Sequence, residues 1–150
     1  MTIDVHSVGN GFAKRILHRD TRARPVLRSR AAAQAAAHAE EWLAAWNAHD
    51  VEAITNCCAD DVVLVASGIA TSWSGRHGSL RGRRALGEHL TRQLELTPDL
   101  ALTKEGVFVT PGGYALLCRR EKGDRVIETV ELDRNALAAR VTVFAESAVA

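Results

Sequence analysis

Residues 45–64, AWNAHDVEAITNCCADDVVL, hold the end of one helix, a short second helix and the start of a strand. Asp50 stands directly before helix-forming residues, and its carboxylate suits the N-cap of a helix over Val51–Cys58. Asp60 and Asp61 precede an aliphatic run that is typical of a buried strand. We therefore interpret these acidic residues as markers of fold boundaries rather than as a catalytic cluster.

The elements on either side of this stretch follow an order typical of an α+β fold. Upstream, helix formers from Ala31 to Asn47 place apolar residues at i, i+3, i+4 and i+7. Downstream come a Gly- and Ser-rich loop over residues 68–82 and a third predicted helix over Arg83–Leu96. Turn signals then separate four extended segments, which predict an antiparallel meander: Leu100–Thr110, Tyr114–Glu121, Arg125–Asp133 and Arg140–Glu146.

Charge divides the 150-residue chain near residue 30. The first 30 residues hold seven Lys or Arg against two Asp, whereas the other 120 hold twelve Lys or Arg against sixteen Asp or Glu. Residues 1–30 also contain few large apolar side chains, so we expect a flexible basic extension followed by one domain over residues 31–150. A basic arm can bind nucleic acid or serve as a transit peptide, but a solvated extension is the favoured interpretation, and nucleic acid is not an expected partner.

Composition and cysteine spacing exclude several classes of protein. No apolar run approaches the roughly 20 residues that cross a bilayer, and no secretory signal begins the sequence, so a cytoplasmic location without membrane contact is expected. The three cysteines, Cys57, Cys58 and Cys118, match neither a disulfide framework nor a zinc motif. We therefore predict no metal and no other cofactor. Sixteen Arg against three Lys indicates a GC-rich bacterial genome.

The hairpin around Lys122–Asp124 predicts which side chains face the core. A two-residue turn places odd positions of the first strand on the same face as even positions of the second. That face would carry Leu117, Arg119, Glu128 and Val130. Because a lone buried charge is costly, Arg119 and Glu128 should either pair near the rim or line a pocket, and both alternatives remain open.

Four stretches also follow one another as they do in a known family: WLAAWNAHDVEAITNCCADDVVL, GRHGSLRGRRALGEHL, TPDLAL and IETVELD. Over about residues 34–146 the chain resembles the SnoaL-like branch of the nuclear transport factor 2-like superfamily, with its ketosteroid isomerase and polyketide cyclase relatives. The resemblance implies a cone-shaped α+β barrel, in which N-terminal helices pack in the concave face of a curved, mainly antiparallel sheet. It leaves the reaction open, because this fold hosts isomerases, cyclases, dehydratases and proteins without chemistry.

The ketosteroid isomerase pattern implies roles for individual positions. The tyrosine that binds the enolate falls at Trp42, the general-base aspartate at Ala66, the protonated acid at or near Glu128, and a pocket aromatic residue at His89. The general base is therefore missing. The resemblance implies a retained pocket rather than a retained isomerase reaction.

The candidate catalytic residues are His89 and Glu128 for proton transfer, with Arg119 or Trp42 steadying an oxyanion. Burial would raise the pKa of Glu128 unless Arg119 lowers it. A merely structural role stays open for His89 and for the two tryptophans of the first helix. The candidate substrate-binding residues are Trp42, Trp46, Ala66, Trp73, His77, Leu117, Val130 and Phe144, of which Trp73 and His77 would cover the pocket mouth.

Two functions of different class follow. The first is a cofactor-free isomerase, cyclase or dehydratase that acts on an apolar cyclic carbonyl compound. The second is a non-catalytic module that binds a hydrophobic small molecule or a partner chain. The apolar outer sheet face, assigned to Leu116, Cys118, Ile127 and Thr129, also predicts a homodimer through the sheets.

Overall fold

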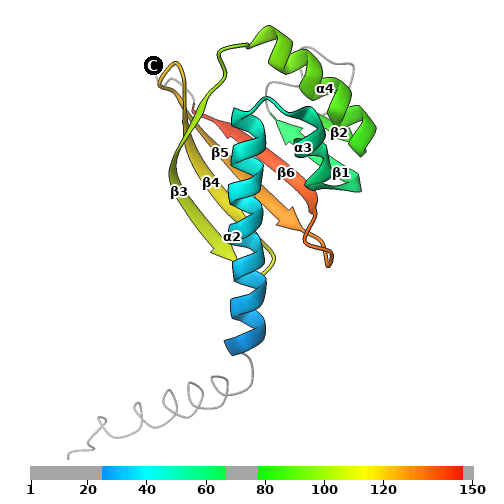
Figure 1. Cartoon of the computed structure of the whole chain (residues 1–150), viewed down its shortest axis with the longest axis vertical. Helices are drawn as coiled ribbons and strands as arrows, with labels where there is room; N and C mark the ends of the chain where they lie inside the picture. Colours follow the sequence, from blue (N-terminus) through cyan, green and yellow to red (C-terminus); the bar gives the residue numbers. More distant parts are fainter. Residues whose placement is uncertain (1–24, 67–77, 147–150) are drawn as a thin grey trace, which may run out of the picture.

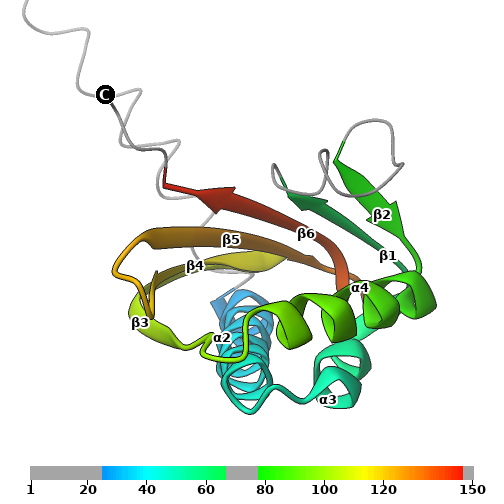
Figure 2. The ribbon, with the colours of Figure 1, turned by 90° about the horizontal axis from the view of Figure 1, so that it is seen from above.

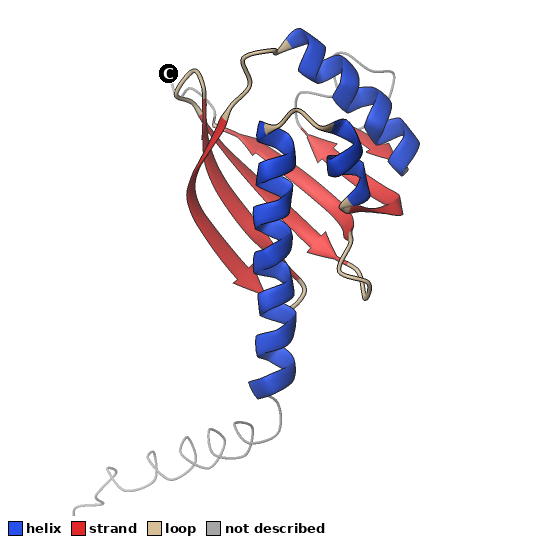
Figure 3. Ribbon diagram, in the orientation of Figure 1, coloured by secondary structure: helices blue, strands red, loops and turns tan. Residues whose placement is uncertain are grey.

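The computed structural model describes residues 25–66 and 78–146. Within these ranges there are three helices and six strands, and all of them except β2 follow the predicted order (Figures 1 and 3). They are α2 (Pro25–Asn47), α3 (Val51–Asn56), β1 (Cys58–Ala66), β2 (Ser79–Arg81), α4 (Arg83–Leu96), β3 (Leu102–Thr110), β4 (Gly113–Arg120), β5 (Arg125–Leu132) and β6 (Ala138–Ala145). The first helix thus begins six residues earlier than Ala31, and the predicted loop over residues 68–82 contains the strand β2. The division into an extension and a domain stays a prediction.

The six strands form one curved, open sheet in the order β2-β1-β6-β5-β4-β3. All neighbouring strands are antiparallel except β1 and β6, which run parallel. All three helices lie on the concave side of the sheet (Figure 2). α2 packs against β3 and β4, while α3 and α4 cover the end formed by β1 and β2. This arrangement confirms the expected α+β cone.

The stretch from Asn47 to Asp50 fixes the end of α2 against the start of β3. The Asn47 side chain donates to the Leu102 carbonyl at 3.0 Å and accepts from the Leu102 amide at 2.8 Å. His49 adopts a φ of 53° and bonds through Nε2 to the Leu100 carbonyl at 2.7 Å. Asp50 caps α3 by accepting from the Ala53 amide at 3.0 Å. These residues hold the fold together, as predicted for Asp50.

The core lies between α2, α4 and the concave face of the sheet. Its largest fully buried side chains come from all layers: Trp42, Ile54, Val62, Leu86, Leu90, Leu116, Val130 and Val141. Leu86, Leu90 and Leu94 form a buried stripe on α4, which explains how a helix with many charged residues stays attached. Across the two described ranges, no helix is both long and apolar enough to span a membrane.

The hairpin between β4 and β5 differs from the predicted two-residue turn. Arg120 and Asp124 are hydrogen-bonded through their backbones, and Gly123 between them has a φ of 94°. This longer connection, with glycine in the left-handed region, shifts the pairing by one residue. Leu116 therefore stands opposite Glu128, and even positions of both strands share the inner face.

The predicted face of β4 was consequently wrong. Leu116 and Cys118 are buried in the core instead of lying on the outer face. Arg119 is exposed and Leu117 only half-buried, because both lie on the convex side. Arg119 and Glu128 therefore occupy opposite faces of the sheet and do not form the predicted pair.

Candidate functional site

A cluster of buried polar and aromatic side chains joins α2 to the concave face of the sheet. α2 supplies His38 and Trp42, which are one helical turn apart, whereas β4 supplies Tyr114 and β5 supplies Glu128. Each of the four side chains is less than 10% exposed. Within this cluster, two hydrogen bonds cross from helix to sheet, from Trp42 to Glu128 and between Tyr114 and His38.

Glu128 has a buried carboxyl group, and one of its two oxygens already accepts a hydrogen bond. Its Oε2 accepts a hydrogen bond of 2.6 Å from the indole Nε1 of Trp42. Burial raises the pKa of Glu128, and the Trp42 hydrogen bond opposes that rise. The indole N–H can only donate, so Oε2 accepts. Because the carbonyl oxygen of a neutral acid is its better acceptor, this hydrogen bond favours the proton on Oε1. Glu128 can therefore present an O–H donor through Oε1.

His38 and Tyr114 form the second buried connection. His38 Nε2 lies 2.9 Å from the carbonyl oxygen of Cys57, and His38 Nδ1 lies 2.9 Å from the Tyr114 hydroxyl. A carbonyl only accepts, so Nε2 carries the proton and, in the neutral ring, Nδ1 accepts from Tyr114. Burial, followed by the charge of Glu128, raises the pKa of Tyr114 well above its ordinary value. Tyr114 therefore stays protonated and donates to His38.

Three aromatic side chains of α2 pack against one another in a row at this cluster. The ring of His38 stacks on Trp42 with centroids 6.1 Å apart, and Trp42 meets Trp46 edge to face at 6.1 Å. Trp46 is only 8% exposed, and its indole Nε1 finds no hydrogen-bond partner within residues 25–66 and 78–146. A buried donor without a partner costs roughly 1–3 kcal/mol, so it is a place where a ligand acceptor would be stabilising.

The predicted site residues divide between this cluster and other parts of the molecule. Trp42, Trp46, Glu128 and Val130 are buried together in the core. Ala66 is half-buried at the end of β1, where its amide donates to Gly78. Trp73 and His77 lie outside the described residues.

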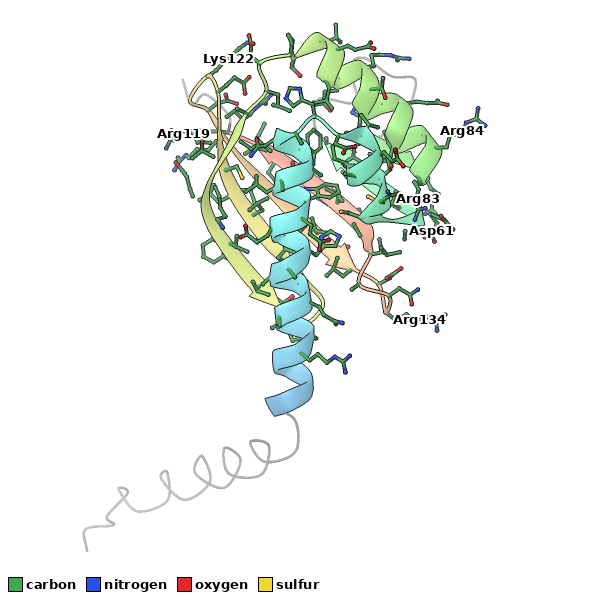
Figure 4. The ribbon with its side chains drawn as sticks, viewed as in Figure 1. Asp61, Arg83, Arg84, Arg119, Lys122 and Arg134 are labelled. Atoms are coloured by element: carbon green, nitrogen blue, oxygen red, sulfur yellow. The ribbon has the colours of Figure 1, made fainter. Side chains whose placement is uncertain are left out.

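Three further candidates lie away from Glu128. Arg119 projects from the edge of the sheet away from α2 (Figure 4), where it pairs with Glu105 at 2.7 Å and donates to the Gly123 carbonyl. Leu117 shares this convex face, and Phe144 is 52% exposed there, next to β5. The face prediction failed for Arg119 and Leu117 because the hairpin connection is longer than two residues.

His89 lies on α4, whose main neighbours are α3, β1 and β2. It is half-buried, and burial, together with the charge of Arg92, lowers its pKa, while a hydrogen bond with Gln93 raises it. A lowered pKa keeps the imidazole neutral near pH 7. Glu128 comes from β5, and its side chain is hydrogen-bonded to Trp42 of α2. His89 and Glu128 therefore lie on elements that pack against different parts of the molecule.

The sequence prediction missed His38 and Tyr114. His38 precedes Trp42 by four residues, so both belong to one helix face, and this spacing was the available signal. Tyr114 shares the inner face with Leu116 because the β4 positions alternate. The wrong hairpin parity placed Tyr114 outside the core and so concealed its contact with His38.

Other candidate sites are weaker on chemical grounds. Among residues 25–66 and 78–146, no group of three His, Cys, Asp or Glu side chains is placed to hold a metal ion. An open groove of about 520 Å³ lies between α3 and α4. Its wall has balanced charges and consists of Val51, Arg84, Gly87, Glu88, Thr91, Arg92 and Glu95. It contains none of the buried cluster.

Solved structures with the same architecture come from several bacteria. A SnoaL-like protein of unknown function from Burkholderia thailandensis is 25% identical, with a TM-score of 0.72 over 77% of this chain and 96% of that chain. A Kribbella flavida protein with the provisional name ketosteroid isomerase is 21% identical, with a TM-score of 0.63 over 79% of this chain and 82% of that one.

A third similar structure is TerC co-crystallised with polyporic acid. It is 15% identical and has a TM-score of 0.63 over 75% of this chain and 92% of that chain.

The curated proteins contain no match to the sequence. The model of the SnoaL-like domain matches residues 39–143, which is more than half of the chain. The chain therefore belongs to the SnoaL-like family.

Proposed function

We propose that this protein binds an apolar cyclic carbonyl compound beside Glu128 and catalyses a cofactor-free proton transfer next to the carbonyl. The reaction class is that of an isomerase, cyclase or dehydratase. The observation that carries the proposal is the buried Glu128 carboxyl group, whose Oε2 accepts from Trp42 and whose pKa is raised by burial. Perturbed acids of this kind are concentrated at functional sites.

The chemical role of Glu128 follows from its hydrogen bonding. A neutral carboxyl group with Oε1–H as donor can bind a carbonyl oxygen and stabilise the negative charge that develops on it. The indole N–H of Trp46, which has no partner among residues 25–66 and 78–146, is a further buried donor for such an oxygen. The aromatic rings of Trp42 and Trp46 offer flat apolar surface to a cyclic ligand. Among the similar structures, TerC was crystallised with polyporic acid.

Two carboxyl variants on the same strand test this proposal. Glu128→Gln keeps the side-chain shape but removes the acidic proton, whereas Glu131→Gln changes an exposed residue of β5. The probe is 2-tetralone, an apolar bicyclic ketone whose α-hydrogens exchange with D₂O through the enol. NMR measures this exchange, and tryptophan fluorescence measures binding.

We expect wild type and Glu131→Gln to bind the ketone and accelerate its exchange. Glu128→Gln should slow the exchange by about 100-fold, as expected for loss of one group at a developing oxyanion. Equal rates in wild type and Glu128→Gln would refute the role of Glu128. No binding and no acceleration by wild type would refute the function.

A non-catalytic binding role is the alternative. It is favoured by Ala66 at the position where the resemblance implies the general-base aspartate, and by the location of Arg119 on the outer face. Under this alternative 2-tetralone quenches tryptophan fluorescence in wild type, while its hydrogen exchange stays at the rate in buffer. The same titration therefore separates the two functions.

We also propose a homodimer through the convex sheet face. Phe108, Ile127 and Phe144 are exposed there by 65%, 41% and 52%. Ile127 stands opposite both Leu117 and Phe144, so an apolar row crosses three strands. Ion pairs within the chain border this row, including Arg119–Glu105 and Arg125–Glu146. A second copy would therefore meet an apolar strip whose bordering charges are already paired.

Sedimentation tests the dimer. Wild type should sediment as a dimer at micromolar concentration, and Ile127→Lys should sediment as a monomer because it places a charge in the apolar row. Leu96→Lys is the matched control, since Leu96 is 77% exposed at the end of α4 and away from the sheet. A monomeric wild type, or a dimeric Ile127→Lys variant, would contradict this interface.

A further inference from the structure

We infer that Tyr114 is a second reacting group of the Glu128 site and that His38 is the base that takes its proton. Tyr114 would touch the substrate, while His38 would act through Tyr114. The inference rests on the proposed function, because both steps need a carbonyl compound bound beside Glu128.

The first support is the order of the hydrogen bonds. Tyr114 Oη lies 2.9 Å from Nδ1 of His38, and Nε2 of His38 lies 2.9 Å from the Cys57 carbonyl. A hydroxyl group, a base within hydrogen-bond reach and a third group that orients the base form the general pattern of an activated oxygen. The Cys57 carbonyl fixes the proton on Nε2, so the lone pair of Nδ1 faces the phenol.

The second support is the position of Tyr114 relative to Glu128. Tyr114 stands opposite Val130, which follows Glu128 by two residues on the same inner face. Such diagonal neighbours on adjacent strands are within reach of aromatic and long side chains. One small ligand could therefore contact both.

The proposed step balances without any co-reactant. Tyr114 Oη takes a proton from the carbon next to the ligand carbonyl, while its own O–H proton passes to Nδ1 of His38. The electron pair of the broken C–H bond forms the C=C bond of the enol. The carbonyl π pair moves to oxygen, which takes the proton from Oε1 of Glu128. In the reverse step the enol O–H proton returns to Oε1 of Glu128, the carbonyl re-forms, and the C=C pair takes a proton from Tyr114, which regains its own proton from His38. Return to another carbon gives isomerisation, and replacement of the His38 proton by a solvent deuteron before its return gives exchange.

Several titratable groups surround the Tyr114–His38 pair, and among them Glu128 determines how this step depends on pH. Around the pair lie Trp42 on α2, Cys57 and Cys58 at the start of β1, and Glu128 on β5. Burial raises the pKa of both thiols and of Glu128, so these groups favour their neutral forms. The relay requires a protonated Glu128, so the exchange rate should fall at high pH as Glu128 loses its proton.

Variants of the full chain test the relay with 2-tetralone exchange in D₂O. Tyr114→Phe keeps the ring and removes the hydroxyl, while His38→Gln keeps an amide that can donate to the Cys57 carbonyl. Each should lower the exchange rate by about 100-fold, the size typical of a lost general base, while 2-tetralone still quenches tryptophan fluorescence. The double variant should be no slower than either single variant, because the two residues act as one unit.

His49→Asn is the matched histidine control. His49 also bonds to a backbone carbonyl, but it lies at the junction of α2 and α3, and asparagine tolerates its positive φ. This variant should keep the wild-type exchange rate and pH profile. In His38→Gln the exchange rate should fall while the affinity for 2-tetralone stays at the wild-type value, a split that a purely structural histidine would not produce.

The outcomes separate this inference from the proposed function. If Glu128→Gln loses exchange while Tyr114→Phe or His38→Gln keeps it, the relay is refuted and the role of Glu128 stands. If the double variant is much slower than either single variant, the relay is also refuted. If wild type does not accelerate exchange at all, the proposed catalysis and the relay fall together.

Discussion

Glu128→Gln should change how the stability of this protein depends on pH. Glu128 is 6% exposed, and burial raises its pKa above the ordinary value of 4.5 against the opposing hydrogen bond from Trp42. The folded protein therefore keeps a proton on Glu128 at pH values where the unfolded chain has lost it. Glutamine carries no titrating proton, so the variant lacks this dependence.

The sign and size of the effect follow from proton linkage. Stability from a carboxyl group with a raised folded pKa is fully present below the unfolded pKa of 4.5 and is lost as pH rises through the folded pKa. One additional proton in the folded state gives a slope of about −1.4 kcal/mol per pH unit. The free energy of unfolding of wild type, minus that of Glu128→Gln, should therefore fall by up to this amount per unit.

Urea unfolding, followed by tryptophan fluorescence between about pH 5 and about pH 8, measures this difference. Glu131→Gln is the control, because Glu131 is exposed on the same strand. Its stability relative to wild type should change much less over this range. The proposal of a buried neutral Glu128 would be refuted if the free energies of unfolding of wild type and Glu128→Gln changed in parallel with pH. It would also be refuted if wild type gained stability relative to the variant as pH rises.

Two further substitutions test the fold around the site. Asn47→Ala removes both hydrogen bonds to the Leu102 backbone, so urea unfolding should show a loss of about 2–3 kcal/mol; a loss under about 0.5 kcal/mol would contradict that role. In Gly113→Ala the added Cβ would overlap a backbone carbonyl of β5, whereas no neighbouring atom of the described part of the chain lies within 4 Å of a Cβ at Gly112. Thermal unfolding should therefore show a large loss for Gly113→Ala and little change for Gly112→Ala, and equal melting temperatures would contradict the tight β4–β5 contact.

Local patterns were sufficient to predict the helices and most strands. Asp50 marks the start of α3 because a short acidic side chain before helix formers can bond the free amides of the first turn. The leucine spacing of α4 predicts its buried stripe, since positions three and four residues apart share a face. In contrast, β2 has only three residues, too few for an alternating pattern, and it depends on pairing with β1.

The site was harder to predict because it depends on the register of one hairpin. The number of residues between Arg120 and Asp124 decides which face Tyr114 and Arg119 occupy, and one extra residue moves every side chain of a strand to the other face. Glu128 was correctly expected to face inward. Its partner is Trp42 rather than Arg119, a pairing that no local pattern of either strand or helix specifies.

The central claim, that Glu128 is a neutral hydrogen-bond donor to a carbonyl ligand, is tested most directly by infrared spectroscopy of bound 2-tetralone labelled with ¹³C at its carbonyl. In wild type the carbonyl stretch should move to lower frequency than in water-free solvent, and in Glu128→Gln most of this shift should be lost. A bound ketone with the same carbonyl frequency in wild type and in Glu128→Gln would contradict the claim.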